Sequence, residues 1–406
     1  MTVEVQSKSK LYGAGLAVVS AILATVSVAQ VRGSFISIGY QDGFSLARQA
    51  DKIVADIEVN HGAQSREGKW REVRALSKAA LQKEPLAASA IRNLALAFDQ
   101  EGRDQAARDA MFLSLNITRR DLATQFWLIQ YFGKKNDLTR VLRHVDQSLR
   151  TKEAAWTRLI PALHIAMVNA ELVDPMIAML KTRPPWQQQF WTGIEGHPAS
   201  LENLADVLIG LRRSDAKIDP FIPQAVINQL GYEGRFAKAQ EVYRLVYGRN
   251  NFSQKGQYVN NSDFKIDRGR TVFDWATNNS PDIEAYIDST EGALFISANG
   301  ELEAVAAIQT IRLPAGKYRF SSQLAEESKN STDVLSVDLV CAEKKYAQTR
   351  PVFQAKLTDK VVASDFTVSQ GGCNFFNIRV LVLPSEVRSN RTLAISNISI
   401  KSVTSM

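Results

Sequence analysis

Few residues of this 406-residue chain have the types and spacing that catalysis requires. The sequence contains no HExxH, GxSxG or Walker motif and no GxGxxG that opens a helix, so the residues for the corresponding hydrolytic, phosphoryl-transfer and dinucleotide chemistry are missing. Its four histidines are far apart, at positions 61, 144, 164 and 197. His197 lies on a predicted loop near Trp191 and Glu195, but this cluster has no nucleophile with a partner. We therefore predict that the chain is not an enzyme and uses no metal or cofactor.

One aromatic residue is a candidate for binding a sugar. Trp275 is the only tryptophan after position 191 and lies within Phe273-Asp274-Trp275. An exposed indole ring can stack on a pyranose ring, whereas a lone tryptophan in a β-domain can also belong to the core. The sequence leaves both interpretations open, and we include Trp275 among the candidate ligand-binding residues.

Basic residues gather between positions 119 and 152 with few acidic residues among them. The candidates for binding an acidic partner or an anionic polysaccharide are Arg119, Arg120, Lys134, Lys135, Arg140 and Arg143. The alternative is that they form the solvated outer face of two helices. The whole chain has 49 Lys and Arg against 42 Asp and Glu, a mild net charge of +7. We expect no nucleic-acid partner, because no recognition motif accompanies the basic residues.

The amino-terminal region predicts a membrane anchor. Residues 11–30 contain no charge, and Lys8 and Lys10 precede them. A helix of twenty residues spans about 30 Å, the thickness of the hydrocarbon core of a bilayer. We predict a cytoplasmic tail at 1–10, a single transmembrane helix at 11–30 in the inner membrane of a bacterium, and the bulk of the chain in the periplasm. A cleaved signal peptide is the alternative, because Ser27-Val28-Ala29 resembles a cleavage site.

The two cysteines, Cys341 and Cys373, are too few for a four-cysteine zinc site or a disulfide-rich scaffold. The predicted anchor places both in an oxidising compartment. No third ligand suggests a metal, and no CxxC motif suggests redox activity. We therefore predict a disulfide rather than two free thiols, closing a loop of about 32 residues and stabilising the fold by about 3–4 kcal/mol.

Residues 43–248 have the periodicity of helices, punctuated by Gly and Asn-Asp. Similar residues recur 34 positions apart, in the pairs Leu94/Leu128, Phe98/Phe132, Gly102/Asn136, Ala107/Val141 and Met111/Val145. This period is that of a helix–turn–helix repeat. The stretch 153–219, which contains Pro184-Pro185, departs from the pattern, and we expect irregular or lengthened helices there.

This helical region resembles the tetratricopeptide repeat family. The residues that occupy the family's positions are Pro85, Leu94, Ala95, Phe98, Gly102, Ala107, Leu128, Phe132, Asn136, Val226, Gly234, Ala239 and Tyr243. The resemblance covers roughly 65–152 and 220–248. It implies an α-solenoid whose concave surface binds peptides or partner proteins without catalysis, and whose units need neighbours because one helix pair cannot bury its own apolar face.

The composition changes near Arg249. Residues 249–270 are rich in Asn, Ser, Gly and Lys, which predicts a linker or a domain edge. Short alternating apolar runs follow at 293–296, 335–339, 377–383 and 393–400, and 311–320 reads as strand, turn and strand. Turn signals separate these runs at the intervals of an antiparallel sandwich, which we predict over 271–406.

The C-terminal region resembles jelly-roll domains of the carbohydrate-binding-module or galactose-binding type. The resemblance rests on the segments 313–320 (LPAGKYRF) and 395–403 (ISNISIKSV). It implies sugar binding through exposed aromatic and acidic side chains. The predicted fold class is therefore α plus all-β in two domains: a tetratricopeptide-like α-solenoid followed by an antiparallel β-sandwich, preceded by one transmembrane helix.

These features favour a membrane-anchored periplasmic adaptor. Its helical repeats would hold an envelope or secretion-complex protein, and its sandwich would hold a polysaccharide, in cell-envelope or exopolysaccharide assembly. The alternative is a polysaccharide hydrolase or lyase, with catalytic groups in 153–219 and the sandwich as its binding module. Its catalytic carboxylates would come together only in the fold.

Overall fold

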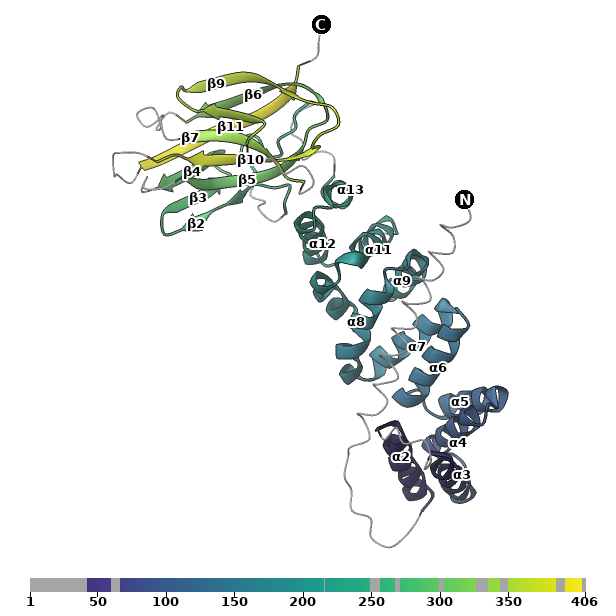
Figure 1. The fold of residues 1–406 in the computed structure, drawn as a ribbon. Coiled ribbons are helices and arrows are strands. Elements are labelled where there is room, and N and C mark those ends of the chain that lie inside the picture. Colours follow the sequence, from purple (N-terminus) through teal and green to yellow (C-terminus); the bar gives the residue numbers. More distant parts are fainter. Residues whose placement is uncertain are drawn as a thin grey trace. The chain divides into compact units, whose positions relative to one another are not determined.

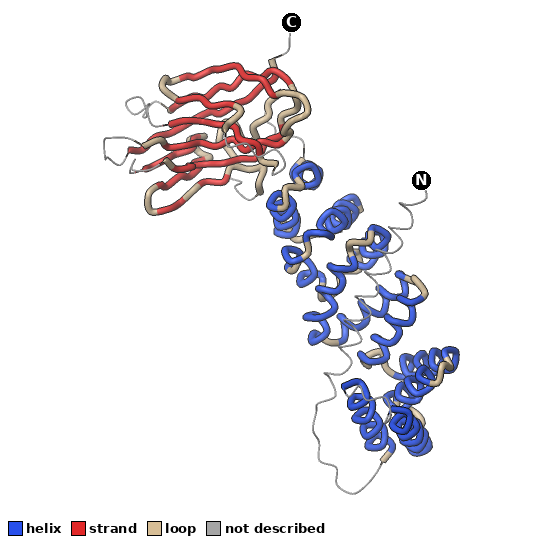
Figure 2. Tube along the Cα trace, viewed as in Figure 1, coloured by secondary structure: helices blue, strands red, loops and turns tan. Residues whose placement is uncertain are grey.

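The structure is a computed structural model, and it describes residues 42–59, 66–214, 216–248, 256–266, 271–298, 303–325, 335–343, 350–384 and 391–403. Helices come first along the chain and strands follow (Figures 1 and 2). The chain divides into two compact units between Leu211 and Arg212. The predicted tail and anchor at 1–30 lie outside the described residues. Among the described helices, none alone has the length and hydropathy to cross a bilayer, and one pair, Glu153–Ala166 with Ala170–Leu180, meets these criteria jointly but is bent by 119°.

The described part of the N-terminal unit is helical. Its α-helices are α2 (Gly43–Val59), α3 (Arg66–Lys83), α4 (Ala88–Gln100), α5 (Asp104–Ile117), α6 (Leu122–Lys134), α7 (Leu138–Thr151), α8 (Trp156–Ala166), α9 (Val173–Leu180), α10 (Gln187–Thr192) and α11 (Leu201–Arg213). Side-chain caps mark two of the starts. Asp42 accepts a hydrogen bond from the backbone N–H of Ser45 at α2, and Asp137 accepts one from that of Arg140 at α7.

Two helix pairs repeat with the predicted period. α6 begins 34 residues after α4, and α7 begins 34 residues after α5. The turn residues Gly102 and Asn136 occupy the same place in the two pairs, and both are left-handed, with φ of 71° and 56°. Glycine and asparagine are the residues that adopt this conformation at least cost, which explains their recurrence. The period of 34 is thus present over 88–151, and membership of the tetratricopeptide family stays a prediction.

The stretch 153–219 is irregular, as the sequence predicts. Short 3₁₀ turns separate its helices at Glu153–Ala155, Ala170–Leu172, Ile194–Gly196 and Pro198–Ser200. Pro161 lies inside α8, where it supplies no backbone N–H to the helix. Arg183, immediately before Pro184-Pro185, is left-handed with φ of 51°. Proline and backbone turns therefore prevent the 34-residue pattern from continuing here.

The C-terminal unit begins with a third helix pair, α12 (Phe221–Tyr232) and α13 (Phe236–Tyr247), joined through the left-handed Gly234 (φ 77°). The sequence groups this pair with the repeats of 43–248, whereas the structure groups it with the strands. The reason is packing, because the hydroxyl of Tyr243 donates a hydrogen bond to Asp274 at 2.9 Å and the Phe236 ring stacks on that of Phe375. The division therefore lies near 211 rather than at the predicted 248.

The rest of the C-terminal unit is a two-layer antiparallel β-sandwich (Figure 1). One sheet has the order β1-β5-β10-β7-β8 and the other β2-β3-β4-β11-β6-β9. The strands are β1 (Ala276–Thr277), β2 (Asn279–Ser280), β3 (Ile283–Asp288), β4 (Ala293–Ala298), β5 (Ala304–Arg312), β6 (Gly316–Leu324), β7 (Leu335–Cys341), β8 (Phe353–Lys356), β9 (Val361–Val368), β10 (Phe375–Val382) and β11 (Arg391–Ser402). The predicted fold class, helical region followed by sandwich, is confirmed.

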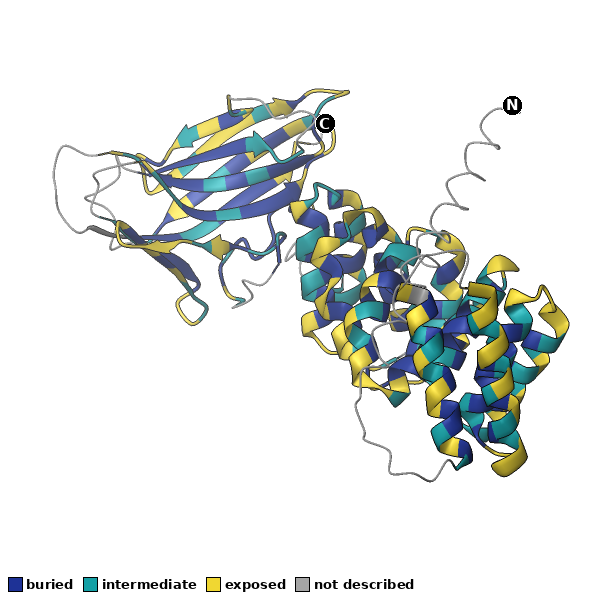
Figure 3. Cartoon of the chain, turned by 60° about the horizontal axis from the view of Figure 1, so that its bottom comes forward, coloured by how far each residue is buried: buried dark blue, intermediate teal, exposed yellow. Residues whose placement is uncertain are grey.

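Alternation along the strands builds the core between the two sheets. In β3, Ile283 and Ala285 are buried while Glu284 and Tyr286 are exposed. Buried and exposed residues alternate along strands of the sandwich in this way, as expected for strands with one face toward water (Figure 3). The core contains the inward residues of both sheets, including Leu294, Phe320, Val337, Ile378 and Ile400. Outward residues that are exposed, such as Glu284 and Tyr286 of β3, are therefore available for binding.

Candidate functional site

A polar row crosses the outer face of the five-stranded sheet. Arg379 of β10 pairs in register with Ile308 of β5 and with Asp338 of β7, and Asp338 pairs with Gln354 of β8. The residues on either side of Asp338 and Arg379 in the sequence belong to the core: Val337, Leu339, Ile378 and Val380. Because side chains alternate along a strand, Asp338 and Arg379 point away from the core.

Asp338 and Arg379 form a bidentate ion pair across the two strands. Nε of Arg379 donates to Oδ1 of Asp338 at 2.9 Å, and Nη2 donates to Oδ2 at 2.6 Å. The Asp338 side chain is only 3% exposed and that of Arg379 is 30% exposed. Hydrogen bonding to Asp338 raises the pKa of Arg379, so the guanidinium stays charged. The two planar groups are therefore fixed in position before any ligand arrives.

The burial of β7 is unusual for a strand with an outer face. Its first five residues are all buried, so the outward Ser336 and Asp338 are as inaccessible as the inward Leu335, Val337 and Leu339. The hydroxyl of Ser336 donates to the carbonyl of Ala355 at 3.1 Å. Polar groups at such positions are stable only when they are hydrogen-bonded. Ser336 and Asp338 thus form a buried, hydrogen-bonded polar layer in the middle of this sheet, which we call the polar floor.

More polar side chains surround this floor. Thr310 donates to Oδ1 of Asn377 at 2.9 Å, and Gln354 donates through Nε2 to Ser336 at 3.4 Å. Nδ2 of Asn377 and Oε1 of Gln354 have no hydrogen-bond partner among the described residues. Lys356 pairs in register with Ser336 and is exposed. We call these outward residues the Asp338 face: Thr310, Ser336, Asp338, Gln354, Lys356, Asn377 and Arg379.

The chemistry of the Asp338 face suits a ligand with many hydroxyl groups. Amide, guanidinium and ammonium groups offer donors, and the Gln354 amide oxygen offers an acceptor. Ser336, Asp338 and Arg379 already hold their hydrogen bonds, so this part of the face needs little ordering of side chains on binding. Sequence reasoning missed this face, although the alternation in 335–339 and 377–383 places Ser336 with Asp338 and Asn377 with Arg379. What the sequence does not give is the register that brings β7 beside β10.

An exposed aromatic residue lies on the outer face of the other sheet. Tyr286 of β3 is 49% exposed, and its ring stacks on that of Phe295 of β4 at 5.3 Å between centroids and 15° between planes. Phe295 packs in a small cluster with Ala293 and Ala394. This is the aromatic surface that Trp275 was expected to supply.

Trp275 itself is buried, which corrects the sugar-stacking prediction. Its side chain is 2% exposed and lies in the sandwich core, where its ring is 5.7 Å from that of Phe264. A ring without an exposed face cannot stack on a pyranose. The alternative interpretation, a core tryptophan, is the one that the structure supports.

The six basic candidates of the helical region do not form one patch. All are exposed, but Arg119 and Arg120 precede α6, whereas Lys134 and Lys135 lie at its other end. A helix of this length separates its ends by about 20 Å. The structure therefore places the six candidates in two groups along the chain, and their binding of an acidic partner or a polysaccharide stays a prediction.

Two residues of the second group, Lys135 and Arg140, already contact neighbouring side chains. Nζ of Lys135 lies 4.5 Å from the centroid of the Tyr131 ring. The Arg140 guanidinium lies 4.9 Å from that of Phe132 and pairs with Asp137 at 3.1 Å. Lys134 and Arg143 are exposed nearby. Binding of an acidic partner by either group stays a prediction.

The histidine cluster of the irregular region is a packing feature. His164 is 1% exposed, and its Nε2 donates to the carbonyl of Phe190 at 2.7 Å. The ring of His197 lies 5.1 Å from that of His164 between centroids. Trp191 is buried and Glu195 is exposed. No catalytic set involving these residues appears in the described part of 153–219.

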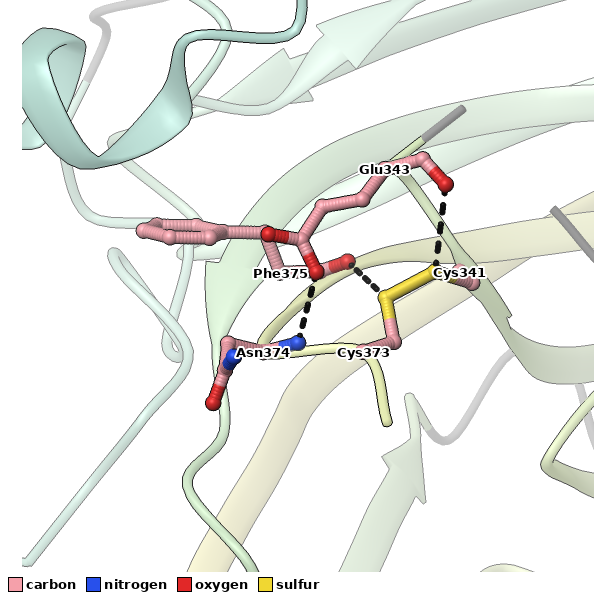
Figure 4. Close-up of a disulfide and its surroundings, with 5 residues drawn as sticks. All are labelled: Cys341, Glu343, Cys373, Asn374 and Phe375. Atoms are coloured by element: carbon pink, nitrogen blue, oxygen red, sulfur yellow. Dashed lines mark hydrogen bonds between the residues drawn. A yellow bond between two sulfur atoms is a disulfide. The ribbon is translucent and has the colours of Figure 1, made fainter. Parts of the chain in front are cut away.

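The two cysteines are bonded to each other. Cys341 at the end of β7 and Cys373 before β10 form a disulfide with their Sγ atoms 2.04 Å apart (Figure 4). The carboxylate of Glu343 accepts a hydrogen bond from the backbone N–H of Asn374 at 2.9 Å beside it. The disulfide joins β7 to the segment that enters β10, the two strands that carry Asp338 and Arg379.

Comparisons with known proteins give weak likenesses. No known protein family and no curated protein matches the chain. One similar solved structure is described as "CBM4 structure and function", with 13% identity, coverage of 36% of this chain and 99% of that chain, and a TM-score of 0.26. Another is a variant of CBM29-2, a family 29 carbohydrate-binding module, with 12% identity, 32% and 89% coverage, and a TM-score of 0.19. Likenesses at this level do not indicate a ligand for this chain.

Proposed function

We propose that the protein is a carbohydrate-binding adaptor, in which the Asp338 face of the sandwich binds a polysaccharide. The observation that carries the proposal is the buried, bidentate Asp338–Arg379 pair on the outer face of a sheet. A charged pair at such a place costs desolvation and is a poor source of stability on its own. Its fixed geometry is instead suited to holding a ligand's hydroxyl groups.

Binding would proceed without rearrangement of the floor. The amide of Gln354 and the amide of Asn377 would exchange hydrogen bonds with neighbouring sugar hydroxyls, and Arg379 would donate through the N–H groups that Asp338 does not use. The half-buried aliphatic Ile308 and Val340 beside them offer apolar surface to the C–H groups of the ring. The exposed Lys356 favours a polysaccharide that carries carboxylates.

The helical unit completes the proposed adaptor. Its regular pairs repeat every 34 residues over 88–151, an arrangement that in repeat proteins builds extended binding surfaces. We propose that it holds an envelope or secretion-complex protein while the amino-terminal segment anchors the chain in the inner membrane. The polysaccharide would thus be kept beside an assembly complex without being cleaved.

A glycan array with the full chain tests the sugar-binding proposal. We expect binding to a polysaccharide, loss of at least about tenfold in affinity in Gln354→Ala and Asn377→Ala, and a larger loss in Arg379→Gln. The matched control is Arg319→Gln, because Arg319 and Asp365 form a similar bidentate pair at 2.7 and 3.0 Å on the other sheet, exposed to solvent. That variant should bind as the wild type does.

Four outcomes would contradict the proposal. A blank array would show that the protein does not bind the sugars tested. Binding that is lost in Tyr286→Ala but kept in Gln354→Ala would show that the site lies on the six-stranded sheet. If chromatography showed that the protein shortens the bound polysaccharide, the protein would be an enzyme instead of an adaptor. Capture of a named secretion-complex subunit through 66–211 together with a blank array would make the sandwich an assembly element.

A further inference from the structure

Three metal-ligating side chains meet at the disulfide. Sγ of Cys341, Sγ of Cys373 and a carboxylate oxygen of Glu343 all lie within 4.8 Å of one another (Figure 4). In the part of the chain that the structure describes, no other trio of His, Cys, Asp or Glu side chains meets so closely. Two sulfurs and one carboxylate oxygen, atom types that bind zinc in proteins, are thus gathered at one point of the sandwich.

Glu343 is held in this position by the chain segment that carries Cys373. Its Oε2 accepts a hydrogen bond at 2.9 Å from the backbone N–H of Asn374, the residue after that cysteine. Glu343 itself lies two residues beyond Cys341, so a short loop from each cysteine contributes to one cluster. A hydrogen bond of this kind orients a carboxylate in the way that second-shell donors orient metal ligands.

The separations suit a small tetrahedral ion once the sulfur–sulfur bond is broken. Zinc binds thiolate sulfur at about 2.3 Å and carboxylate oxygen at about 2.0–2.2 Å, which places two sulfurs about 3.8 Å apart and sulfur and oxygen about 3.5 Å apart. The two sulfurs must therefore separate from 2.04 Å, and the carboxylate oxygen, which lies within 4.8 Å of both, must come to about 3.5 Å from each. Two thiolates and one carboxylate leave a fourth position for water, as in zinc sites with three protein ligands.

We propose that the reduced protein binds a zinc ion through Cys341, Cys373 and Glu343. An external dithiol would supply two electrons and two protons, converting the disulfide to two thiols while the reductant forms its own disulfide. Zinc would then displace the two thiol protons and bind the two thiolates and the carboxylate. The ends of β7 and of the segment before β10 would thus stay cross-linked in both redox states, by a covalent bond in one and by a metal in the other.

The cross-link between Cys341 and Cys373 lies close to a contact with the helix pair α12 and α13. Phe375 follows Cys373 by two residues and stacks on Phe236 of α13. Sγ of Cys373 lies 2.8 Å from the carbonyl oxygen of Phe375, so the position of the sulfur and the start of β10 are linked. A bound metal would hold this contact when the disulfide cannot.

Cobalt substitution tests the site on the full chain. The protein is reduced with a phosphine under nitrogen in metal-free buffer and titrated with Co²⁺, which gives a thiolate-to-cobalt charge-transfer band in the near ultraviolet only when sulfur ligates. We expect one cobalt ion per chain, release of about two protons as cobalt binds the two thiols, displacement of the cobalt by one equivalent of zinc, and no band in the oxidised protein. Glu343→Gln keeps a hydrogen-bond acceptor for Asn374 but loses the charged ligand, and its cobalt affinity should fall at least about tenfold.

Controls distinguish the cluster from two thiols alone. Cys341→Ser should abolish the band, whereas Glu284→Gln, an exposed residue of β3, should leave the affinity unchanged. Equal affinity in Glu343→Gln and in the wild type would overturn the proposal, as would a reduced, folded protein that gives no band. Circular dichroism follows the fold, and a sandwich that unfolds on reduction and is not restored by zinc would overturn it too.

Discussion

Phe236, the first residue of α13, stacks on Phe375, the first residue of β10, with ring centroids 5.5 Å apart and planes inclined by 27°. The two residues are far apart in the sequence and belong to elements of different class. Further contacts accompany the stack, since a Cβ added to Gly231 of α12 would lie 2.8 Å from the Val272 side chain. The last helix pair is therefore fitted to the sandwich and is part of its fold.

Removing this stack should destabilise the C-terminal unit. Phe236 is 7% exposed, and its replacement by alanine leaves a cavity beside Phe375, so Phe236→Ala should lower the free energy of unfolding by about 3 kcal/mol. The measurement is urea unfolding followed by near-ultraviolet circular dichroism. Phe221→Ala is the matched control, because Phe221 of α12 is 62% exposed and should cost less than about 0.5 kcal/mol. Equal effects of the two changes would show that the pair is not docked.

The disulfide should contribute through the length of the loop that it closes. Cys341 and Cys373 are 32 residues apart, for which the chain-entropy relation gives about 3–4 kcal/mol. We expect the double variant Cys341→Ser, Cys373→Ser to lose this amount in urea unfolding, in chelator-treated buffer that excludes metal. A loss below about 1 kcal/mol would mean that the unfolded chain keeps this loop closed without the bond.

Local features of this fold and the disulfide between its two cysteines could be predicted from the sequence, whereas the pairing of the strands could not. The turn at Gly102 and its counterpart at Asn136 follow from residue type and spacing, because few residues tolerate positive φ. The alternating run at 335–339 locates β7, since a period of two is the property of a strand. These inferences need only neighbours in the sequence.

The candidate site depends on contacts that no local pattern specifies. Asp338 and Arg379 are 41 residues apart, and only the pairing of β7 with β10 brings them together. Trp275 has the type of side chain that stacks on sugar rings. It is buried because it packs with Phe264 and the other core residues. The six basic residues are close in the sequence, but the length of α6 keeps them in two groups.

A buried ion network in the N-terminal unit gives a third prediction. Arg92 of α4 donates to Asp121 before α6 at 2.6 Å and also binds Asp51 of α2, and both acids are 18% exposed. Burial lowers the pKa of Arg92, but the charges of Asp121 and Asp51 outweigh it and raise the pKa overall. Arg92→Met leaves two largely buried carboxylates without their cation, with only the hydrogen bonds from Asn93 and Thr124 remaining, and should lower the free energy of unfolding in urea by about 3–5 kcal/mol.

Matched variants separate this network from an ordinary surface pair. The triple change Asp51→Asn, Arg92→Met, Asp121→Asn should recover much of the loss, because no uncompensated charge remains. Arg71→Met should cost less than about 0.5 kcal/mol, since Arg71 and Glu67 are 76% and 83% exposed. If Arg92→Met behaved as Arg71→Met does, Asp51 and Asp121 would have to reach water in solution.

Two buried histidines predict how the stability of the N-terminal unit depends on pH. Burial lowers the pKa of His144 to about 4, with a smaller contribution from the charge of Arg143. Burial also lowers the pKa of His164 to about 4. The hydrogen bond to Phe190 raises this pKa, and the charge of His197 lowers it further. His144 lies 2.8 Å through Nδ1 from Oε1 of Gln125, and Nδ1 of His164 has no partner, so neither ring has a second acceptor ready for an added proton.

The sign follows from proton binding. Between pH 4 and about 6.5 the unfolded chain protonates these histidines and the folded chain does not, so stability is full above pH 6.5 and falls as the pH drops toward 4. Each histidine should account for about 3 kcal/mol of the loss. We expect urea midpoints, followed by tryptophan fluorescence, to decrease from pH 7.5 to 4.5, and to decrease less in His164→Gln and least in the double variant with His144→Gln. If the urea midpoint of the double variant decreased with pH as steeply as that of the wild type, the pH dependence would come from the carboxylates instead.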